Sequence, residues 1–202
     1  MNLGQMIMVI GAIALLGILV LNANTSVYQA NDTMYTSEFG VTAISLATSL
    51  VDEAMGKDFD SKVAATATFT FDSTLLTAVG SLGPEVSDHE SYRGFTAGTK
   101  DFNDFDDFNG LKLCYHSDLA ADSDNTPGFI QMPPVSGMRA KYYVTCSVCY
   151  VNPPNLDAAF NSHQSWHKKI VITVWSPSAI RPGSNPPVLD TLVYPAIMSY
   201  WN

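Results

Sequence analysis

Charged side chains are missing from the start of this chain. No Asp, Glu, Lys or Arg precedes Asp32, and no Lys or Arg precedes Lys57. Across 202 residues, 10 Lys and Arg stand against 19 Asp and Glu, which gives a formal net charge of -9. The chain therefore lacks the clustered cations that neutralise nucleic-acid phosphates or anionic lipids, and we expect no nucleic-acid partner. Because 47% of the residues are hydrophobic, the composition is also unlike that of a disordered chain.

Cysteines and catalytic motifs are scarce as well. The chain has only Cys114, Cys146 and Cys149, too few for a disulfide scaffold. It contains no nucleophile elbow, no phosphate-binding glycine loop and no HExxH zinc motif. We therefore predict no catalytic residues, and the sequence does not indicate an enzyme.

What the beginning of the chain does contain is an apolar run from Leu3 to Leu21, interrupted only by Gln5. At about 1.5 Å per helical residue, this run spans the hydrocarbon core of a bilayer. One interpretation is a cleaved secretory signal, but a basic segment before the run and a small-residue cleavage site after it are both missing. A second is a single-pass anchor, which usually carries Lys or Arg at its cytoplasmic end. A third is a helix that leaves the membrane and packs against copies of itself.

The residues after Leu21 favour the third interpretation because they continue the helical pattern without a proline. Two neighbouring stripes at helical spacing are expected to face a partner domain. One stripe runs through Val27, Ala30, Met34, Val41, Ile44, Ala47, Val51 and Ala54, and the other through Phe39, Ala43, Leu46 and Leu50. Gly56 then fits a C-cap. We predict one helix over 2–56, with an apolar half (1–22) and an amphipathic half (23–56), and local unwinding near Asn22, Asn24, Thr25 and Ser26, which are poor helix formers.

The remaining residues, 57–202, predict a β-rich domain. Segments with strand composition are bounded by Pro-rich connections, and Pro195 indicates that the last strand lies at an edge or is broken. The expected strands are Ala65–Phe71, 111–116, 138–151, 168–175 and 190–201. Antiparallel strands that cover a helix face bury both surfaces. The predicted fold class is therefore α+β, with a long N-terminal helix packed against an antiparallel sheet.

This combination of an uncharged apolar helix, its amphipathic continuation and a β-rich domain resembles a type IV pilin or pseudopilin. The resemblance implies a structural subunit of an extracellular filament, held in the inner membrane before assembly. Its partners would be copies of itself and an inner-membrane assembly machinery. The alternatives are a minor pseudopilin of a secretion system and a single-pass membrane-anchored extracytoplasmic binding domain. The filament-core residues that it implies are Leu3, Gly4, Gln5, Ile7, Ile10, Gly11, Ala14, Leu15, Gly17, Ile18 and Leu21.

The sequence departs from that family at one position. The family usually carries Glu at the fifth position of the mature subunit, where it is thought to pair with a neighbouring N-terminal amine. That position is Gln5 if Met1 is the first mature residue, and Val9 if Gly4 precedes the processing site. A Gln side chain can hydrogen-bond an amine but cannot neutralise its charge.

The cysteines allow several interpretations. The spacing Cys146-x2-Cys149-x13-His163-x3-His167 fits a zinc finger, but the CxxC stands inside an alternating strand pattern and not on a tight turn. Residues three apart on a strand point to opposite faces, so only one of the pair can conveniently reach Cys114. We favour a Cys114–Cys146 disulfide, since Cys146 shares a face with Val144 and Val148. The alternative is three buried thiols.

An acidic segment from Asp101 to Gly110 offers a candidate cation site. Asp101, Asp104, Asp106 and Asp107 supply the oxygens that Ca²⁺ prefers, although their spacing is not that of an EF-hand. Some pilin-like proteins hold calcium in such loops. The alternative is a solvated loop with Asx turns. Aromatic side chains at every third position, Phe102, Phe105 and Phe108, are expected to clamp this loop onto the domain.

Overall fold

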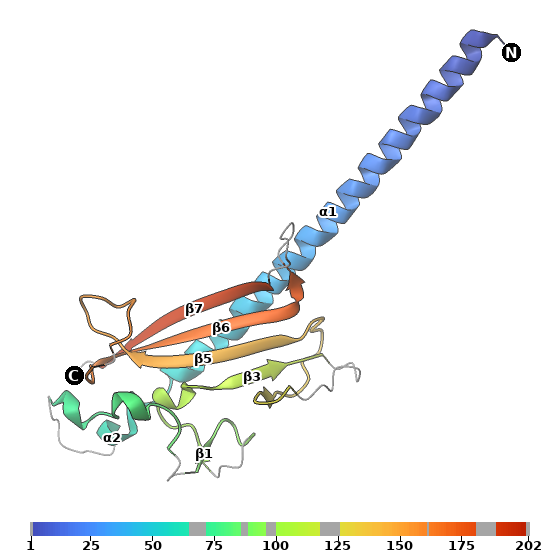
Figure 1. The fold of residues 1–202 in the computed structure, drawn as a ribbon. Helices are drawn as coiled ribbons and strands as arrows, with labels where there is room; N and C mark the ends of the chain where they lie inside the picture. Colours follow the sequence, from blue (N-terminus) through green and yellow to red (C-terminus); the bar gives the residue numbers. More distant parts are fainter. Residues whose placement is uncertain are drawn as a thin grey trace. The chain divides into compact units, whose positions relative to one another are not determined.

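The computed structural model describes residues 2–64, 72–85, 89–95, 100–117, 126–160, 162–180 and 189–200. Figure 1 shows a long helix and a set of strands, the α+β class that the sequence predicted. The expected strand Ala65–Phe71 lies outside the described residues. The elements are helices α1 (Leu3–Met55) and α2 (Ser61–Ala64), 3-10 helices η1 (Ser73–Leu75), η2 (Val79–Ser81) and η4 (Asp106–Phe108), and strands β1 (Glu90–Ser91), β2 (Lys100–Asp101), β3 (Lys112–Tyr115), β4 (Ile130–Gln131), β5 (Tyr142–Tyr150), β6 (His167–Ile180) and β7 (Leu189–Ser199).

Helix α1 has 53 residues and confirms the helix predicted over 2–56. It ends where the amide of Gly56 donates to the carbonyl of Asp52 at 3.1 Å. The expected unwinding near Asn22 is wrong, because the helix is continuous there. The Thr25 hydroxyl donates to the Leu21 carbonyl at 2.7 Å, so this side chain bonds within the helix and does not compete with it.

The chain forms two compact units, which we call the leading segment (Met1–Val41) and the sheet unit (Thr42–Asn202). The leading segment is helical, and its described residues are exposed from Asn2 to Ser37. The sheet unit contains the last turns of α1 and all the described strands. The division falls inside α1, whereas the sequence suggested domains 1–56 and 57–202.

Five strands of the sheet unit form one sheet in the order β4-β3-β5-β6-β7. The pairs β3–β5, β5–β6 and β6–β7 are antiparallel, with Leu113 opposite Val144 and Cys146 opposite Ile172. The expected strands at 111–116, 138–151, 168–175 and 190–201 are therefore confirmed. The sequence did not indicate the short parallel strand β4 beside β3. Strand β7 lies at an edge and pairs with β6 at Pro195, so Pro195 marks an edge and not a break.

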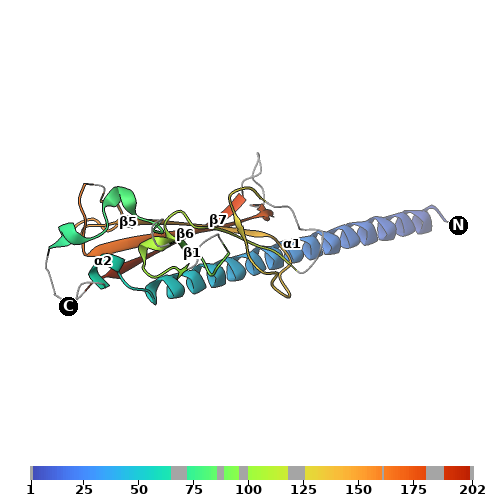
Figure 2. The same cartoon turned by 90° about the horizontal axis from the view of Figure 1, so that it is seen from below.

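The last turns of α1 lie along one face of this sheet (Figures 1 and 2). Alternate residues of β5 are buried, and Val144, Cys146 and Val148 share one face. On α1 the buried side chains of this unit are Ala43, Ala47, Leu50, Val51 and Ala54. Mostly small residues thus lie between helix and sheet, which permits a close approach.

The buried face of α1 combines residues from both predicted stripes. Ala43 and Leu50 come from one stripe, and Ala47, Val51 and Ala54 come from the other. The expectation that Val41 and Ile44 would be buried is wrong, since they are 70% and 49% exposed. Both stripes fit a 3.6-residue period, so periodicity could not select the line along the helix that meets the sheet.

A buried ionic cluster lies beside the end of the sheet. The ammonium of Lys168, on β6, donates to Asp60 Oδ2 at 3.0 Å, to the Phe59 carbonyl at 2.7 Å and to Asp106 Oδ1. The side chains of Lys168, Asp60 and Asp106 are all fully buried. Asp60 also accepts from the Thr77 amide at 2.9 Å. This cluster joins β6 to the segments that contain η4 and Asp60.

Replacing the central cation should strongly destabilise the sheet unit. Lys168→Met leaves two carboxylates buried without their cation, and we expect the free energy of unfolding to fall by about 3–5 kcal/mol. Thermal and chemical unfolding of the intact chain measure this change. Lys112→Met, at the exposed first position of β3, is the matched control and should change stability by less than about 0.5 kcal/mol. Equal effects of the two substitutions would contradict this role for Lys168.

Candidate functional site

The predicted filament-core residues lie on an uncovered helical surface. From Leu3 to Leu21 the large apolar side chains are between 49% and 77% exposed. Helix α1 is long and apolar enough to cross a membrane, by length and composition. An apolar surface of this size requires a lipid or protein environment. The leading segment is therefore compatible with membrane anchoring.

Exposed apolar side chains also continue beyond Leu21. Val27 is 60% exposed, Tyr28 75%, Met34 52% and Tyr35 59%. These residues lie past the stretch that matches a bilayer core. The sequence placed Val27 and Met34 on a face that packs against the partner domain, and their exposure makes that assignment wrong. The leading segment therefore carries apolar surface that a membrane-spanning run alone does not account for.

The small residues of the leading segment have no packing role within the chain. A Cβ added to Gly4, Gly11 or Gly17 would meet no atom within 4 Å. A glycine inside a helix costs about 1 kcal/mol relative to alanine. Gly4 and Gly11, seven residues apart, lie on one side of the helix, whereas Gly17 lies on another. Any close contact that these glycines permit would be made with another molecule.

The acidic segment of the sheet unit is not a solvated loop. Phe102, Phe105 and Phe108 are buried, which confirms that they clamp the loop onto the domain. The Phe102 and Phe108 rings lie 5.4 Å apart, and both contact Tyr92. Asp104, Asp106 and Asp107 are also fully buried, so the expectation of a solvated loop is wrong. Because the three phenylalanines are packed in the core, the aspartates next to them in the sequence are buried as well.

The four predicted calcium ligands do not converge in the described residues. Asp101 is exposed, and Asp106 pairs with Lys168. Asp104 accepts from the amides of Ser61 at 2.7 Å and Asp106 at 3.0 Å, the second an Asx turn as expected. Burial raises the pKa of the Asp106 carboxyl, and the Lys168 ammonium opposes that rise. Of these four predicted ligands, only Asp107 belongs to the cluster of three carboxylates that the structure contains.

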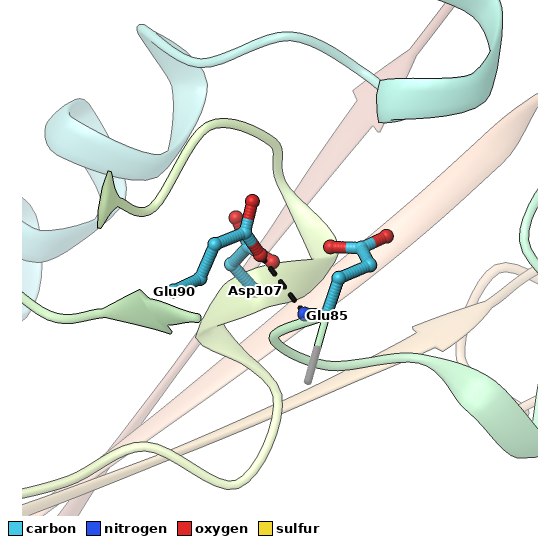
Figure 3. Close-up of side chains that lie close together, drawn as sticks. All are labelled: Glu85, Glu90 and Asp107. Carbon is cyan, nitrogen blue, oxygen red and sulfur yellow. Dashed lines mark hydrogen bonds between the residues drawn. The ribbon is translucent and has the colours of Figure 1, made fainter. Parts of the chain in front are cut away.

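That carboxylate group consists of Glu85, Glu90 and Asp107 (Figure 3). One oxygen from each residue lies within 4.8 Å of the other two. Glu85 follows η2, Glu90 begins β1 and Asp107 belongs to η4. The Glu85 amide donates to Glu90 Oε2 at 2.9 Å. No sequence pattern indicated Glu85 or Glu90, because the fold brings them to Asp107 from separate loops.

Two carboxyl groups of this cluster, those of Asp107 and Glu90, have raised pKa values. Burial, with smaller contributions from the charges of Asp104 and Glu90, raises the pKa of Asp107 to about 7, although the hydrogen bonds from the Asp104 and Asn103 amides oppose the rise. Burial also raises the pKa of Glu90, assisted by its contact with Glu85. A pocket of about 280 Å³ beside Glu90 and Asp107 is also lined by Tyr92, Asn109 and Lys112. Two of the three residues, Glu90 and Asp107, thus line this pocket.

The predicted Cys114–Cys146 disulfide is wrong. All three cysteines are thiols in the structure. Cys114 lies opposite Tyr143 in the β3–β5 register, whereas Cys146 shares the other face of β5 with Val144. Side chains on opposite faces of a sheet cannot be bridged without moving the backbone. The structure agrees with the alternative that the cysteines are thiols. Cys114 and Cys146 are buried, whereas Cys149 is partly exposed.

The zinc-finger spacing does not form a metal centre either. Cys146 and Cys149 lie on opposite faces of β5. The ring of His163 contacts Phe160 at 5.9 Å, and His167 Nδ1 lies 2.8 Å from the Ser199 hydroxyl. These four side chains are held in separate surroundings, as expected from the position of the CxxC within a strand.

Comparisons of the chain with protein-family models, with curated proteins and with solved structures gave no match. Its function is therefore inferred from its own residues.

The thiol assignment predicts a distinct labelling pattern. The denatured chain, without reductant, should titrate as three thiols. In the native chain, iodoacetamide should modify Cys149 first, because burial raises the pKa of Cys146 to about 12 and Cys114 is fully buried. Peptide mass spectrometry after brief alkylation locates the label. A count of one thiol in the denatured chain, or faster labelling of Cys146 than of Cys149, would contradict the assignment.

Proposed function

We propose that this chain is a structural subunit of an extracellular, type IV pilus-like filament. The leading segment packs with copies of itself in the filament core, and the sheet unit forms the outside. Before assembly the apolar run from Leu3 to Leu21 resides in the inner membrane, where an assembly machinery collects the subunits. The proposal includes no catalytic step.

The observation that carries this proposal is the exposed apolar surface beyond Leu21. A single-pass anchor needs apolar residues only across the bilayer. Val27, Tyr28, Met34 and Tyr35 extend past that length and are more than half exposed. Burying each large apolar side chain against a neighbouring subunit contributes about 1.5–3 kcal/mol. Assembly into a filament covers these side chains, whereas anchoring alone leaves them in water.

The absence of charged side chains before Asp32 supports the same proposal. The first charged residue is Asp32, and no Lys or Arg marks a cytoplasmic end. A helix surrounded by other helices cannot hold unpaired charges at low cost. The glycines with open space above them, Gly4 and Gly11 on one side and Gly17 on another, permit close approach from more than one direction. Contacts of this kind, repeated head to tail, produce an open polymer.

Two alternatives share the apolar helix. A minor pseudopilin would form only a short assembly, so it would be a trace component of isolated filaments. A membrane-anchored binding domain would remain a single particle and would not use Val27 or Tyr28 for contacts. These alternatives differ from the proposal in what happens when the surface beyond the membrane run is altered.

A substitution at Val27 separates filament assembly from anchoring. Val27→Asp leaves the Leu3–Leu21 run unchanged but places a carboxylate in the proposed subunit contact. We expect the yield of sheared surface filaments to fall at least about tenfold, because each 1.4 kcal/mol of lost contact energy is a factor of ten. Electron microscopy and quantification of the chain in the filament and membrane fractions measure this.

Val27→Ile is the matched control, since it keeps the apolar contact, and it should assemble normally. Both variants should enter the membrane fraction equally. Normal filament yield with Val27→Asp would contradict the proposed contact. Purified intact chain that stays as single detergent-bound particles, with no filaments on the cell surface, would contradict filament assembly as a whole. A trace amount in abundant filaments would replace the proposal with the pseudopilin alternative.

A further inference from the structure

The carboxylates of Glu85, Glu90 and Asp107 accept hydrogen bonds from nearby amide and hydroxyl groups. Asp107 Oδ2 accepts from the amides of Asn103 at 2.7 Å and Asp104 at 3.1 Å. Glu85 Oε1 accepts from the Ser61 hydroxyl at 3.1 Å. Glu90 accepts from the Glu85 amide and from the Asn103 side chain. These bonds hold the three carboxyl groups in fixed orientations.

Among the residues that the structure describes, two oxygens of this group are buried and have no hydrogen-bond partner. They are Asp107 Oδ1 and Glu85 Oε2. Asp107 as a whole residue is fully buried. An unsatisfied buried acceptor is destabilising, and it is uncommon in folded proteins. The orphaned oxygens therefore point to a ligand that binds carboxylates.

The spacing of the oxygens identifies the class of ligand. Ca²⁺ binds oxygens at about 2.3–2.6 Å, so two ligands on opposite sides of the ion are about 4.6–5.2 Å apart. The separation within this group, at most 4.8 Å, is compatible with a shared ion of that size. Mg²⁺ requires about 2.0–2.1 Å and a nearly ideal octahedron, which three carboxylates from three loops do not readily provide. The adjacent pocket has room for the water ligands that Ca²⁺ needs to complete its coordination.

We propose that Glu85, Glu90 and Asp107 bind one Ca²⁺ ion in the sheet unit. The ion supplies the positive charge that three converging carboxylates otherwise lack, and it satisfies the orphaned oxygens. It joins the loop after η2 and strand β1 to η4, whose neighbouring residue Asp106 binds Lys168. The site does not depend on filament assembly, because all its residues belong to the sheet unit.

Calcium titration of the intact chain tests this inference. The detergent-solubilised chain is freed of divalent ions with EDTA, dialysed and titrated with CaCl₂ by calorimetry. We expect one site per chain with a Kd between about 10⁻⁵ and 10⁻³ M, and a rise in unfolding temperature on adding calcium. Asp107→Asn and Glu90→Gln should each weaken binding at least about tenfold, since each removes a ligand charge.

The matched control is Asp101→Asn, which removes a nearby but exposed carboxylate and should leave the affinity unchanged. Glu90→Gln keeps the inference testable if Asp107→Asn fails to fold, because Glu90 is only partly buried. Absence of calcium binding to the unaltered chain would overturn the inference, as would equal losses in Asp101→Asn and Glu90→Gln. Tighter binding of Mg²⁺ than of Ca²⁺ would overturn the assignment to calcium.

Discussion

The sheet unit depends on one buried cation. Lys168 is surrounded by protein, and its ammonium is satisfied only when Asp60, Asp106 and the Phe59 carbonyl are all in place. The Phe59 and Tyr150 rings lie 4.6 and 5.5 Å from the same nitrogen. A buried charge with any of these partners missing would be costly. The cluster therefore favours a single placement of two loops against β6, where apolar packing alone would tolerate several.

This ion cluster also positions the proposed calcium site. Asp106 and Asp107 are consecutive residues of η4, and they serve different partners: Asp106 binds Lys168, whereas Asp107 joins Glu85 and Glu90. The buried phenylalanines on either side, Phe105 and Phe108, hold the short helix in place. One turn of helix thus carries both the interior ion pair and the carboxylate that faces the neighbouring loops. Contacts with the core determine the position of η4. Asp107 is therefore oriented for the proposed calcium site before the ion binds.

Local patterns in the sequence were sufficient for the elements and insufficient for their pairing. The long helix and the strands β3, β5, β6 and β7 follow from periodicity and composition, whereas the two-residue strand β4 does not. The Cys114–Cys146 prediction failed because the face that Cys114 occupies depends on the β3–β5 register, and a shift of one residue reverses it. The burial of Asp106 could not be foreseen, because its partner Lys168 is remote in sequence. Glu85 and Glu90 had no signal, since only the folded loops bring them to Asp107.

The two proposals make opposite uses of charge along one chain. In the leading segment, the absence of charge before Asp32 lets an apolar helix exchange lipid for neighbouring helices. In the sheet unit, three carboxylates meet, and burial raises the pKa of two of them, Glu90 and Asp107. Calcium sites of extracellular modules commonly have Kd values of about 10⁻⁴–10⁻³ M, which suit the higher calcium concentrations outside cells. A subunit exported to a surface filament would then bind its calcium ion outside the cell. There the sheet unit has to remain folded without the help of chaperones.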